Sequence, residues 1–369
     1  MKQTLFPALK KACTALVYLV AGILTALVLA SLLDHFDLIP GGWAIYGIDF
    51  LPPVWLLGPV VVVSSLAWFY ASRALATGML ILYGVLLVGY GDFSIPWFHG
   101  SVPQPDGAHT LSVAALNVRY YSYGLDNVLS AVKGIGADVT LLSENTLTRE
   151  EEDTLRTLFA PADFAMGRQN GTAIISRYPL LQFREIDLPS HEASLSGGND
   201  VDSMSSHPHR SFIHAVINMG GSRVHVLSIR FIAGRPKDHT LAEGIRWGRY
   251  LLEAQQLEVQ CFVDYVSHLD GPVVFGGDLN APPGSKTMRR ISRIAEDAQL
   301  EHHVWGGFTF RTELPLQRLD YLFSLHGVHS LAAQRLDIVV SDHFPVFARF
   351  AVPPSGALST RITGSTPVH

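Results

Sequence analysis

The chain of 369 residues is short of lysine, of cysteine and of charge in general. Charged residues make up 16% of it, against about 25% in a typical soluble protein, and the formal net charge is −5. The only lysines are Lys2, Lys10, Lys11, Lys133, Lys237 and Lys286. This shortage argues against a protein that holds long nucleic acid by bulk electrostatics, because such binding comes mainly from Lys and Arg at the phosphates.

The two cysteines form no disulfide framework. Cys13 lies in an apolar segment and Cys261 lies far along the chain, so a bond between them is not expected, and the cellular compartment stays open on this ground. The sequence also lacks paired Cys and His residues at zinc-finger spacing, so we expect no structural zinc.

Apolar sequence is in excess instead, at 48% of the chain. Ala12–Leu33, Leu51–Ala71 and Ala74–Gly91 carry no charged residue over 22, 21 and 18 residues, and crossing a bilayer takes roughly 17–25 residues. We predict a membrane anchor over residues 1–91 with three transmembrane helices at 12–33, 51–71 and 74–91. A cleaved signal peptide is the alternative, but its apolar region is usually only about 7–15 residues long.

The charges beside these segments predict the orientation, because positive residues favour the cytoplasmic side. Three lysines precede the first segment, Arg73 separates the second from the third, and Asp34, Asp37 and Asp49 lie between the first two. We therefore expect a multi-pass protein of the inner or plasma membrane, with the rest of the chain extracytoplasmic. The third span is short and contains three glycines, and its loss would leave that part in the cytoplasm.

The later sequence predicts one α/β domain at 110–352, after a linker at 92–109 and before a disordered tail at 353–369. Short apolar runs alternate with helical stretches, and a long Ser-, His- and Gly-rich loop at 190–209 interrupts them. Leu336–Val340 is predicted as a strand. A long helix is predicted at about 238–268, with an apolar face formed by Trp247, Leu251, Ala254, Leu257 and Cys261. The pattern favours a four-layer α/β sandwich, two mixed sheets flanked by helices.

Five short segments place polar or acidic side chains where an apolar strand stops. A carboxylate in such a place usually serves a turn or a helix cap, but five in order suggest a shared crevice. Clusters of carboxylate and amide oxygens suit a hard cation such as Mg²⁺, with Mn²⁺ as a substitute. The residues are Asn117, Glu144, Asp278 with Asn280, Asp320, and Asp342 with His343.

Six motifs in this order resemble the endonuclease/exonuclease/phosphatase superfamily, over about Leu111–Phe350. They are LNVR from Leu116, LLSEN from Leu141, GTAIISRYPL from Gly171, GGDLNAPP from Gly276, RLDYLF from Arg318 and SDHFPV from Ser341. The superfamily includes DNase I-like nucleases, neutral sphingomyelinases and inositol-polyphosphate phosphatases. Three spans followed by this domain also resemble bacterial membrane phosphatases of the superfamily.

The resemblance implies a role for each of these residues. Glu144 corresponds to the principal Mg²⁺ ligand, with Asn117 beside it and Asp342 as an auxiliary ligand. Asp278 corresponds to the residue that orients or deprotonates the attacking water, and Asn280 contacts the scissile phosphate. The family's remaining catalytic pair is matched by His343, which contacts the phosphate, and Asp320, which holds it.

One position departs from the family pattern. Where many members have a histidine after the strand corresponding to Val224–Phe231, this chain has Arg230, a permanently charged and forked phosphate ligand. We expect Arg230 to bind substrate phosphate, together with Arg210 from the preceding strand. Alternatively, His225, His207 or His209 supplies the histidine.

The leading hypothesis is therefore a membrane-anchored, Mg²⁺-dependent phosphoesterase acting on a lipid or polyprenyl-phosphate headgroup, with membrane lipids as partners, because tethering raises the effective concentration of membrane substrates. The alternative is an extracytoplasmic DNase I-like nuclease, which would be expected to show a basic groove. A scaffold without chemistry is disfavoured because the acidic, amide and histidine residues occur together.

Overall fold

The computed structural model describes residues 2–35, 56–89, 107–147, 149–159, 161–167, 171–189, 210–233, 240–302 and 307–354. The chain divides into two compact units, one formed by Met1–Ser94 with Pro282–Lys286, and the other by Ile95–Ala281 with Thr287–His369. Most of the predicted linker and tail, and the whole 190–209 loop with His207 and His209, lie outside the described residues.

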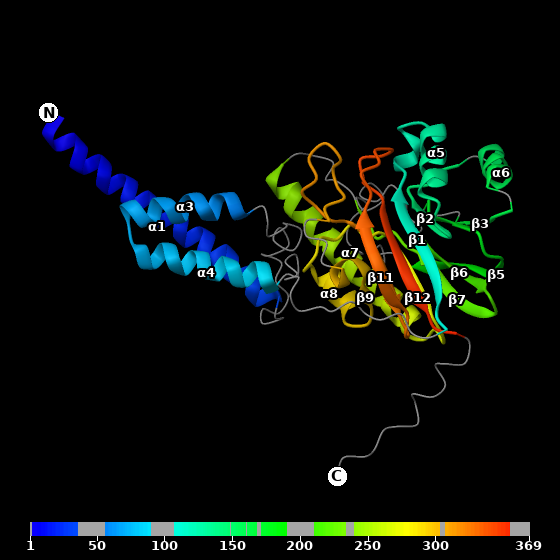
Figure 1. Ribbon diagram of the computed structural model, residues 1–369. Coiled ribbons are helices and arrows are strands. Elements are labelled where there is room, and N and C mark those ends of the chain that lie inside the picture. Colours follow the sequence, from blue (N-terminus) through cyan, green and yellow to red (C-terminus); the bar gives the residue numbers. More distant parts are fainter. Residues whose placement is uncertain are drawn as a thin grey trace, which may run out of the picture. The chain divides into compact units, whose positions relative to one another are not determined.

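The described residues of the first unit form three apolar helices, α1 (Lys2–His35), α3 (Leu57–Tyr70) and α4 (Arg73–Gly89) (Figure 1). Small residues lie at their contacts, where Ala21, Ala67 and Ala76 are buried. Among the described residues, one helical stretch, Lys11–Ala30, is long and apolar enough to cross a membrane, while Leu57–Tyr70 and Arg73–Val85 are shorter apolar helices. The three predicted segments therefore all contain helix, of unequal length.

The outward-facing side chains of this unit are also apolar. Leu19, Phe69 and Ile81 are 61%, 79% and 63% exposed. Most of the large apolar side chains that the structure describes as exposed belong to these three helices. A patch of this extent is unusual on a protein that faces water, where exposed apolar patches mark interaction surfaces.

The second unit is built on two six-stranded sheets (Figure 1). The first has the order β11-β12-β1-β2-β4-β3, and the second has the order β5-β6-β7-β8-β10-β9. Each sheet has one parallel pair, β1 with β2 and β7 with β8, among antiparallel neighbours. The first sheet comprises β1 (His109–Asn117), β2 (Val139–Ser143), β3 (Asp163–Met166), β4 (Ala173–Ser176), β11 (His329–Arg335) and β12 (Val346–Val352). The second comprises β5 (Leu180–Leu188), β6 (Arg210–Met219), β7 (Ser222–Ser228), β8 (Val273–Asp278), β9 (Glu296–Asp297) and β10 (Asp320–Leu325).

Three apolar layers hold this unit together. Residues from both sheets, such as Val113, Ile213 and Leu322, form the central core. The helices α7 (Leu241–Ser267) and α8 (Lys286–Ser292) pack on the outer face of the second sheet. The helices α5 (Leu125–Ile135) and α6 (Arg149–Leu158) cover the outer face of the first sheet, and α9 (Ala298–Glu301) is a single short turn. The predicted four-layer α/β sandwich is confirmed.

One predicted strand is wrong, and one predicted helix face is confirmed only in part. The strand predicted at Leu336–Val340 is absent, and β12 pairs with β1 on one side and with the preceding segment β11 on the other. β11 is an edge strand whose residues are mostly half-buried and polar or small, so it lacks a clear apolar pattern. The apolar run at Leu336–Val340 therefore predicts the strand in the wrong place. On α7, Trp247 and Ala254 of the predicted apolar face are buried, but Leu257 is 40% exposed while Gln255 and Glu258 are buried.

Candidate active site

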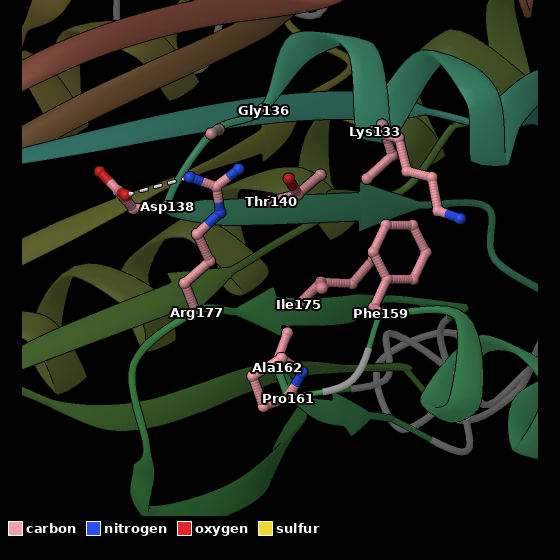
Figure 2. A pocket seen from close by; sticks show the side chains of 11 residues that line it. Lys133, Gly136, Asp138, Thr140, Phe159, Pro161, Ala162, Ile175 and Arg177 are labelled. Carbon is pink, nitrogen blue, oxygen red and sulfur yellow. Dashed lines mark ion pairs between the residues drawn. The ribbon is translucent and has the colours of Figure 1, made fainter.

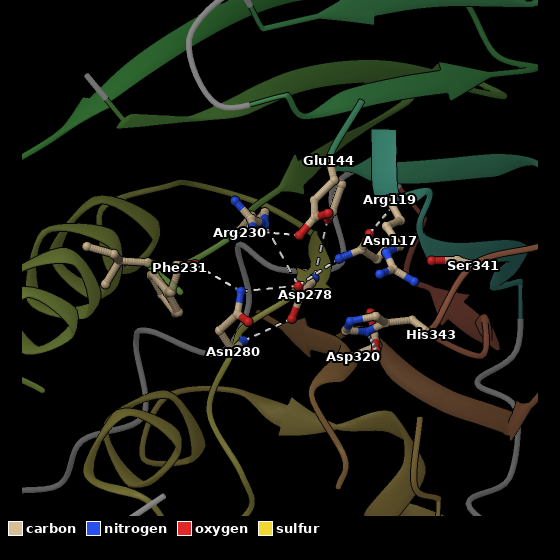
Figure 3. A network of polar contacts seen from close by, with 12 residues as sticks. Asn117, Arg119, Glu144, Arg230, Phe231, Asp278, Asn280, Asp320, Ser341 and His343 are labelled. Carbon is tan, nitrogen blue, oxygen red and sulfur yellow. Dashed lines mark hydrogen bonds and ion pairs between the residues drawn. The ribbon is translucent and has the colours of Figure 1, made fainter. Parts of the chain in front are cut away.

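The strand-end residues predicted from the sequence gather at one edge of the two sheets (Figure 3). Asn117 ends β1 opposite Ser143 of the parallel strand β2. In the second sheet, Asp278 at the end of β8 is paired with Asp320 at the start of β10. The Asn117 amide donates a hydrogen bond of 2.9 Å to the Asp278 carboxylate, so the site is formed where the two sheets meet.

The backbone around the site is unusual. Glu144 and Asn280 have φ of 55° and 47°, and the turn Arg119–Tyr121 has positive φ at all three residues. Side chains of L-residues seldom adopt this conformation, and such strain concentrates at functional sites. Among the described residues, only His326 shares it elsewhere outside glycine.

Two glycines allow β8 to reach the site. A Cβ on Gly276 would lie 2.2 Å from the carbonyl oxygen of Tyr321, and a Cβ on Gly277 would lie 2.2 Å from that of Ile229. Gly277 also has a φ of +136°. The Gly-Gly-Asp sequence is therefore required by the close approach of strands on both sides, and it delivers Asp278 into the crevice.

Asp278 is the centre of the polar network. Its carboxylate is 1% exposed and accepts hydrogen bonds from the Asn117 amide, and from the backbone N–H and side-chain amide of Asn280, at 2.9, 3.0 and 3.1 Å. Burial raises the pKa of Asp278 above its usual range, although the positive charges of His343 and Arg230 oppose the change. A buried carboxylate with a raised pKa is suited to accept a proton at neutral pH.

His343 and Asp320 form a buried pair. The His343 Nδ1 lies 2.7 Å from the Asp320 Oδ2, and its ring packs against Phe310 at 4.7 Å between centroids. Burial lowers the pKa of His343, but the carboxylates of Asp320 and Asp278 outweigh it and raise the pKa to about 9. The imidazole is therefore protonated at neutral pH, which makes it a donor to an anion.

Glu144 contacts an arginine that enters the site from the second sheet. The Arg230 Nη2 lies 2.6 Å from the Glu144 Oε1, and the Arg230 Nε lies 3.8 Å from the Asp278 Oδ2. Arg230 is only 8% exposed. Its side chain thus lies among the candidate catalytic groups, while both ring nitrogens of the alternative residue His225 contact His214 and the Asp270 carbonyl.

Arg210 lies behind Arg230. Its Nη2 donates to the Arg230 carbonyl oxygen at 2.8 Å, and its Nε forms an ion pair with the buried carboxylate of Glu258 on α7. The second Glu258 oxygen accepts from the Ile232 N–H at 2.7 Å. These contacts favour a supporting role for Arg210 over direct contact with a phosphate.

Two buried polar residues of α7 escaped the sequence analysis. The Gln255 amide donates to the carbonyl oxygens of Ile232 and Asn280, at 3.0 and 2.9 Å. Glu258 holds the same segment after β7 through Arg210 and Ile232. Together they fix the backbone of two site-forming loops, and the only sequence signal for them is their spacing of three residues on one helix face.

The side chains that could hold a metal fall into two groups. Asp278, Asp320 and His343 can each offer an atom within 4.8 Å of the others, and the His343 Nδ1 is engaged by Asp320. Glu144 and Asn117 carry the carboxylate and amide oxygens that suit a hard cation. Asp342 pairs with Arg119, two residues after Asn117, at 3.4 Å, so it lies beside this second group.

A separate cavity of about 380 Å³ lies on the outer face of the first sheet (Figure 2). Lys133, Asp138, Phe159 and Arg177 are among its lining residues. Asp138 immediately precedes β2, whereas Glu144 follows it, so the cavity lies at the opposite end of that strand. None of the predicted site residues lines it.

Comparison with known proteins finds similarity over the part of the chain that forms the candidate site. The model of the Endonuclease/Exonuclease/phosphatase family matches residues 114–343. No curated protein matches in sequence. Among solved structures, D. rerio TDP2 complexed with single strand DNA product is 16% identical, covering 66% of this chain and 99% of its own, with a TM-score of 0.50. Humanized D. rerio TDP2 is 15% identical with the same coverage and TM-score. The family protein from Beutenbergia cavernae DSM 12333 is 18% identical, covering 66% and 72%, with a TM-score of 0.49.

Proposed function

Since the chain belongs to the endonuclease/exonuclease/phosphatase family, we propose that it is a membrane-anchored, Mg²⁺-dependent phosphoesterase acting on the phosphate of a lipid or polyprenyl-phosphate headgroup. Members of this family are metal-dependent phosphoesterases and nucleases. The observation that carries the proposal is the position of Asp278, a buried carboxylate with a raised pKa at the meeting point of Asn117, Asn280 and Arg230.

In this mechanism, Asp278 orients a water molecule and takes its proton as the oxygen attacks phosphorus. The P–O bond to the leaving oxygen of the ester or diphosphate breaks, and that oxygen takes up a proton from solvent. Asn280 is held against Asp278 by two hydrogen bonds, and its amide also donates to the Phe231 carbonyl oxygen at 3.1 Å. On substrate binding, one of these amide N–H groups turns to a phosphate oxygen. His343, fixed by Asp320, donates from its protonated ring and stabilises the charge that builds up on the phosphoryl oxygens. Arg230 adds a permanent positive charge beside them.

The donors around Glu144 fit a divalent metal ion, because they are oxygens and one of them is a carboxylate. Glu144 and Asn117 would hold it, with Asp342 as an auxiliary ligand. Bound there, Mg²⁺ or Mn²⁺ would neutralise phosphate charge.

The membrane part of the proposal is supported by the helical unit. Its surface carries exposed apolar residues on all three helices, among them Leu19, Phe69 and Ile81. Water would make such a surface costly, whereas a bilayer would not. We propose that α1, α3 and α4 cross the inner or plasma membrane and that the sandwich domain is extracytoplasmic. A reporter fused after residue 105 tests this orientation, and a cytoplasmic signal would overturn it.

The substrate class is tested with the full chain in detergent micelles. Sphingomyelin, phosphoinositides, undecaprenyl diphosphate and plasmid DNA are each incubated with Mg²⁺ and then with EDTA. We expect turnover of a lipid phosphate that stops with EDTA. Efficient DNA cleavage without lipid turnover would contradict the proposal and favour the nuclease.

A further inference from the structure

Arg230 holds the carboxylate that is the best candidate metal ligand. Its Nη2 lies 2.6 Å from the Glu144 Oε1, within the range of a short charge-assisted hydrogen bond. The arginine is 8% exposed and the Glu144 side chain 14%. The pair is therefore shielded from solvent. Charges interact more strongly in the protein interior than in water.

The backbone of Arg230 is fixed, and its guanidinium faces two acidic side chains of the site. Its carbonyl oxygen accepts from Arg210, and the Ile232 N–H two residues later donates to Glu258. The guanidinium faces Glu144 at 2.6 Å and Asp278 at 3.8 Å (Figure 3). Because the backbone contacts do not involve the guanidinium, a rotation of the side chain would release Glu144 without moving the strand.

A divalent cation at Glu144 would lie near this guanidinium, and the two positive charges would repel each other. Arginine remains charged at every accessible pH, so the repulsion cannot be relieved by losing a proton. It can be relieved by an anion, because the guanidinium fork matches two phosphate oxygens.

We propose that Arg230 competes with the divalent cation for Glu144, and that a bound phosphate removes this competition by taking the guanidinium. Metal and phosphate then bind cooperatively, and by linkage each raises the affinity for the other. The inference rests on the proposed function, because it takes Glu144 as a metal ligand. It differs from a purely supporting role for Arg230, in which loss of the arginine would disorder Glu144 and weaken metal binding.

The test measures Mn²⁺ binding to the full chain in detergent by electron paramagnetic resonance, which does not depend on activity. Arg230→Gln removes the charge and should lower the Mn²⁺ dissociation constant by about tenfold or more. Arg230→Lys keeps a charge and should stay within about threefold of wild type. Circular dichroism melting establishes that each variant is folded.

Inorganic phosphate provides the second arm. Saturating phosphate should tighten Mn²⁺ binding to the wild-type chain, and by a smaller factor in Arg230→Gln, where only direct contact between metal and phosphate remains. Wild-type affinity unmoved by phosphate would overturn the inference even if Arg230→Gln fails to fold.

Glu144→Gln distinguishes a failure of the metal site from a failure of the competition. If it weakens Mn²⁺ binding while Arg230→Gln leaves the affinity unchanged or weaker, the metal site stands and the competition is wrong. If Glu144→Gln binds Mn²⁺ as tightly as wild type, Glu144 is not a ligand, and both the metal site and the competition are overturned.

Discussion

The side-chain amide of Asn117 donates a 2.9 Å hydrogen bond to the carboxylate of Asp278, 161 residues further along the chain. The two residues end strands in different sheets, so this bond joins the sheets at the candidate active site. It also orients the carboxylate to which the proposed mechanism assigns the proton of the attacking water.

Asn117→Ala tests this bond. Removing a donor from a buried carboxylate costs about 2 kcal/mol, so the melting temperature of the full chain in detergent should fall by several degrees. The hydrolysis rate should fall as well, because Asp278 loses an orienting contact and the metal loses a proposed ligand. The control is Asn127→Ala on α5, whose amide caps an exposed carbonyl at 2.7 Å and should have little effect on either measurement.

The close approach at Gly277 gives a second prediction. Gly277→Ala would place a Cβ 2.2 Å from the Ile229 carbonyl oxygen, at a φ of +136°. We expect a loss of about 3 kcal/mol or more in the free energy of unfolding, seen as a sharply lower melting temperature. Gly134→Ala in α5 is the matched control, because nothing lies within 4 Å of its Cβ, and it should be neutral or stabilising. Equal melting temperatures for the two variants would contradict the packing described at Gly277.

The buried ion pair of Arg210 and Glu258 predicts a large difference between two Glu→Gln variants. Glu258→Gln leaves a buried arginine without its counter-ion and should cost about 3–5 kcal/mol. Glu253→Gln breaks the exposed pair with Arg249 on the same helix and should cost less than about 0.5 kcal/mol. Thermal unfolding of both variants measures the two costs. A small loss of stability in Glu258→Gln would show that the Arg210–Glu258 ion pair behind Arg230 contributes little.

The histidine pair on the second sheet predicts a loss of stability in acid. Burial, with the charges of His225 and Arg184, lowers the pKa of His214 from 6.5 to about 4. Between pH 4 and 6.5 the His214 imidazole binds a proton in the unfolded chain but not in the folded one. The contribution of neutral His214 to stability is therefore fully present above pH 6.5 and is lost as the pH drops toward 4. Allowing for partial solvent screening, the loss is on the order of 2 kcal/mol.

His214→Gln should flatten this part of the dependence of melting temperature on pH, without removing the smaller share that comes from the lowered pKa of His225. The control His268→Gln changes an exposed histidine and should keep the wild-type slope. The same slope in His214→Gln as in wild type would show that this residue does not carry the effect.

The sequence predicts most strands and the strand-end residues because both are local features. β8 could be recognised from a short apolar run followed by Gly-Gly-Asp, and Asn117, Asp278 and Asp320 then follow from the strand ends. β11 was missed because an edge strand needs only one paired side and carries little apolar pattern. An apolar run nearby was mistaken for it.

The supporting contacts of the site could not be predicted in this way. Glu258 is a charged residue on a long helix, where the usual expectation is exposure to solvent. Its partner Arg210 lies 48 residues earlier, and no local pattern connects them. For the same reason Arg230 was expected at the substrate phosphate, and its contact with Glu144 emerged only from the arrangement of the two sheets.

The most direct test of the account is the hydrolysis rate of Asp278→Asn in the full chain, with Mg²⁺, on whichever compound of the substrate panel the wild type turns over fastest. The substitution keeps the size of the side chain and removes the proton acceptor, so the rate should fall by about 10²–10⁴. Asp126→Asn, at an exposed position in the first turn of α5, should keep the wild-type rate. An Asp278→Asn enzyme as fast as the wild type would contradict the central claim that Asp278 activates the water.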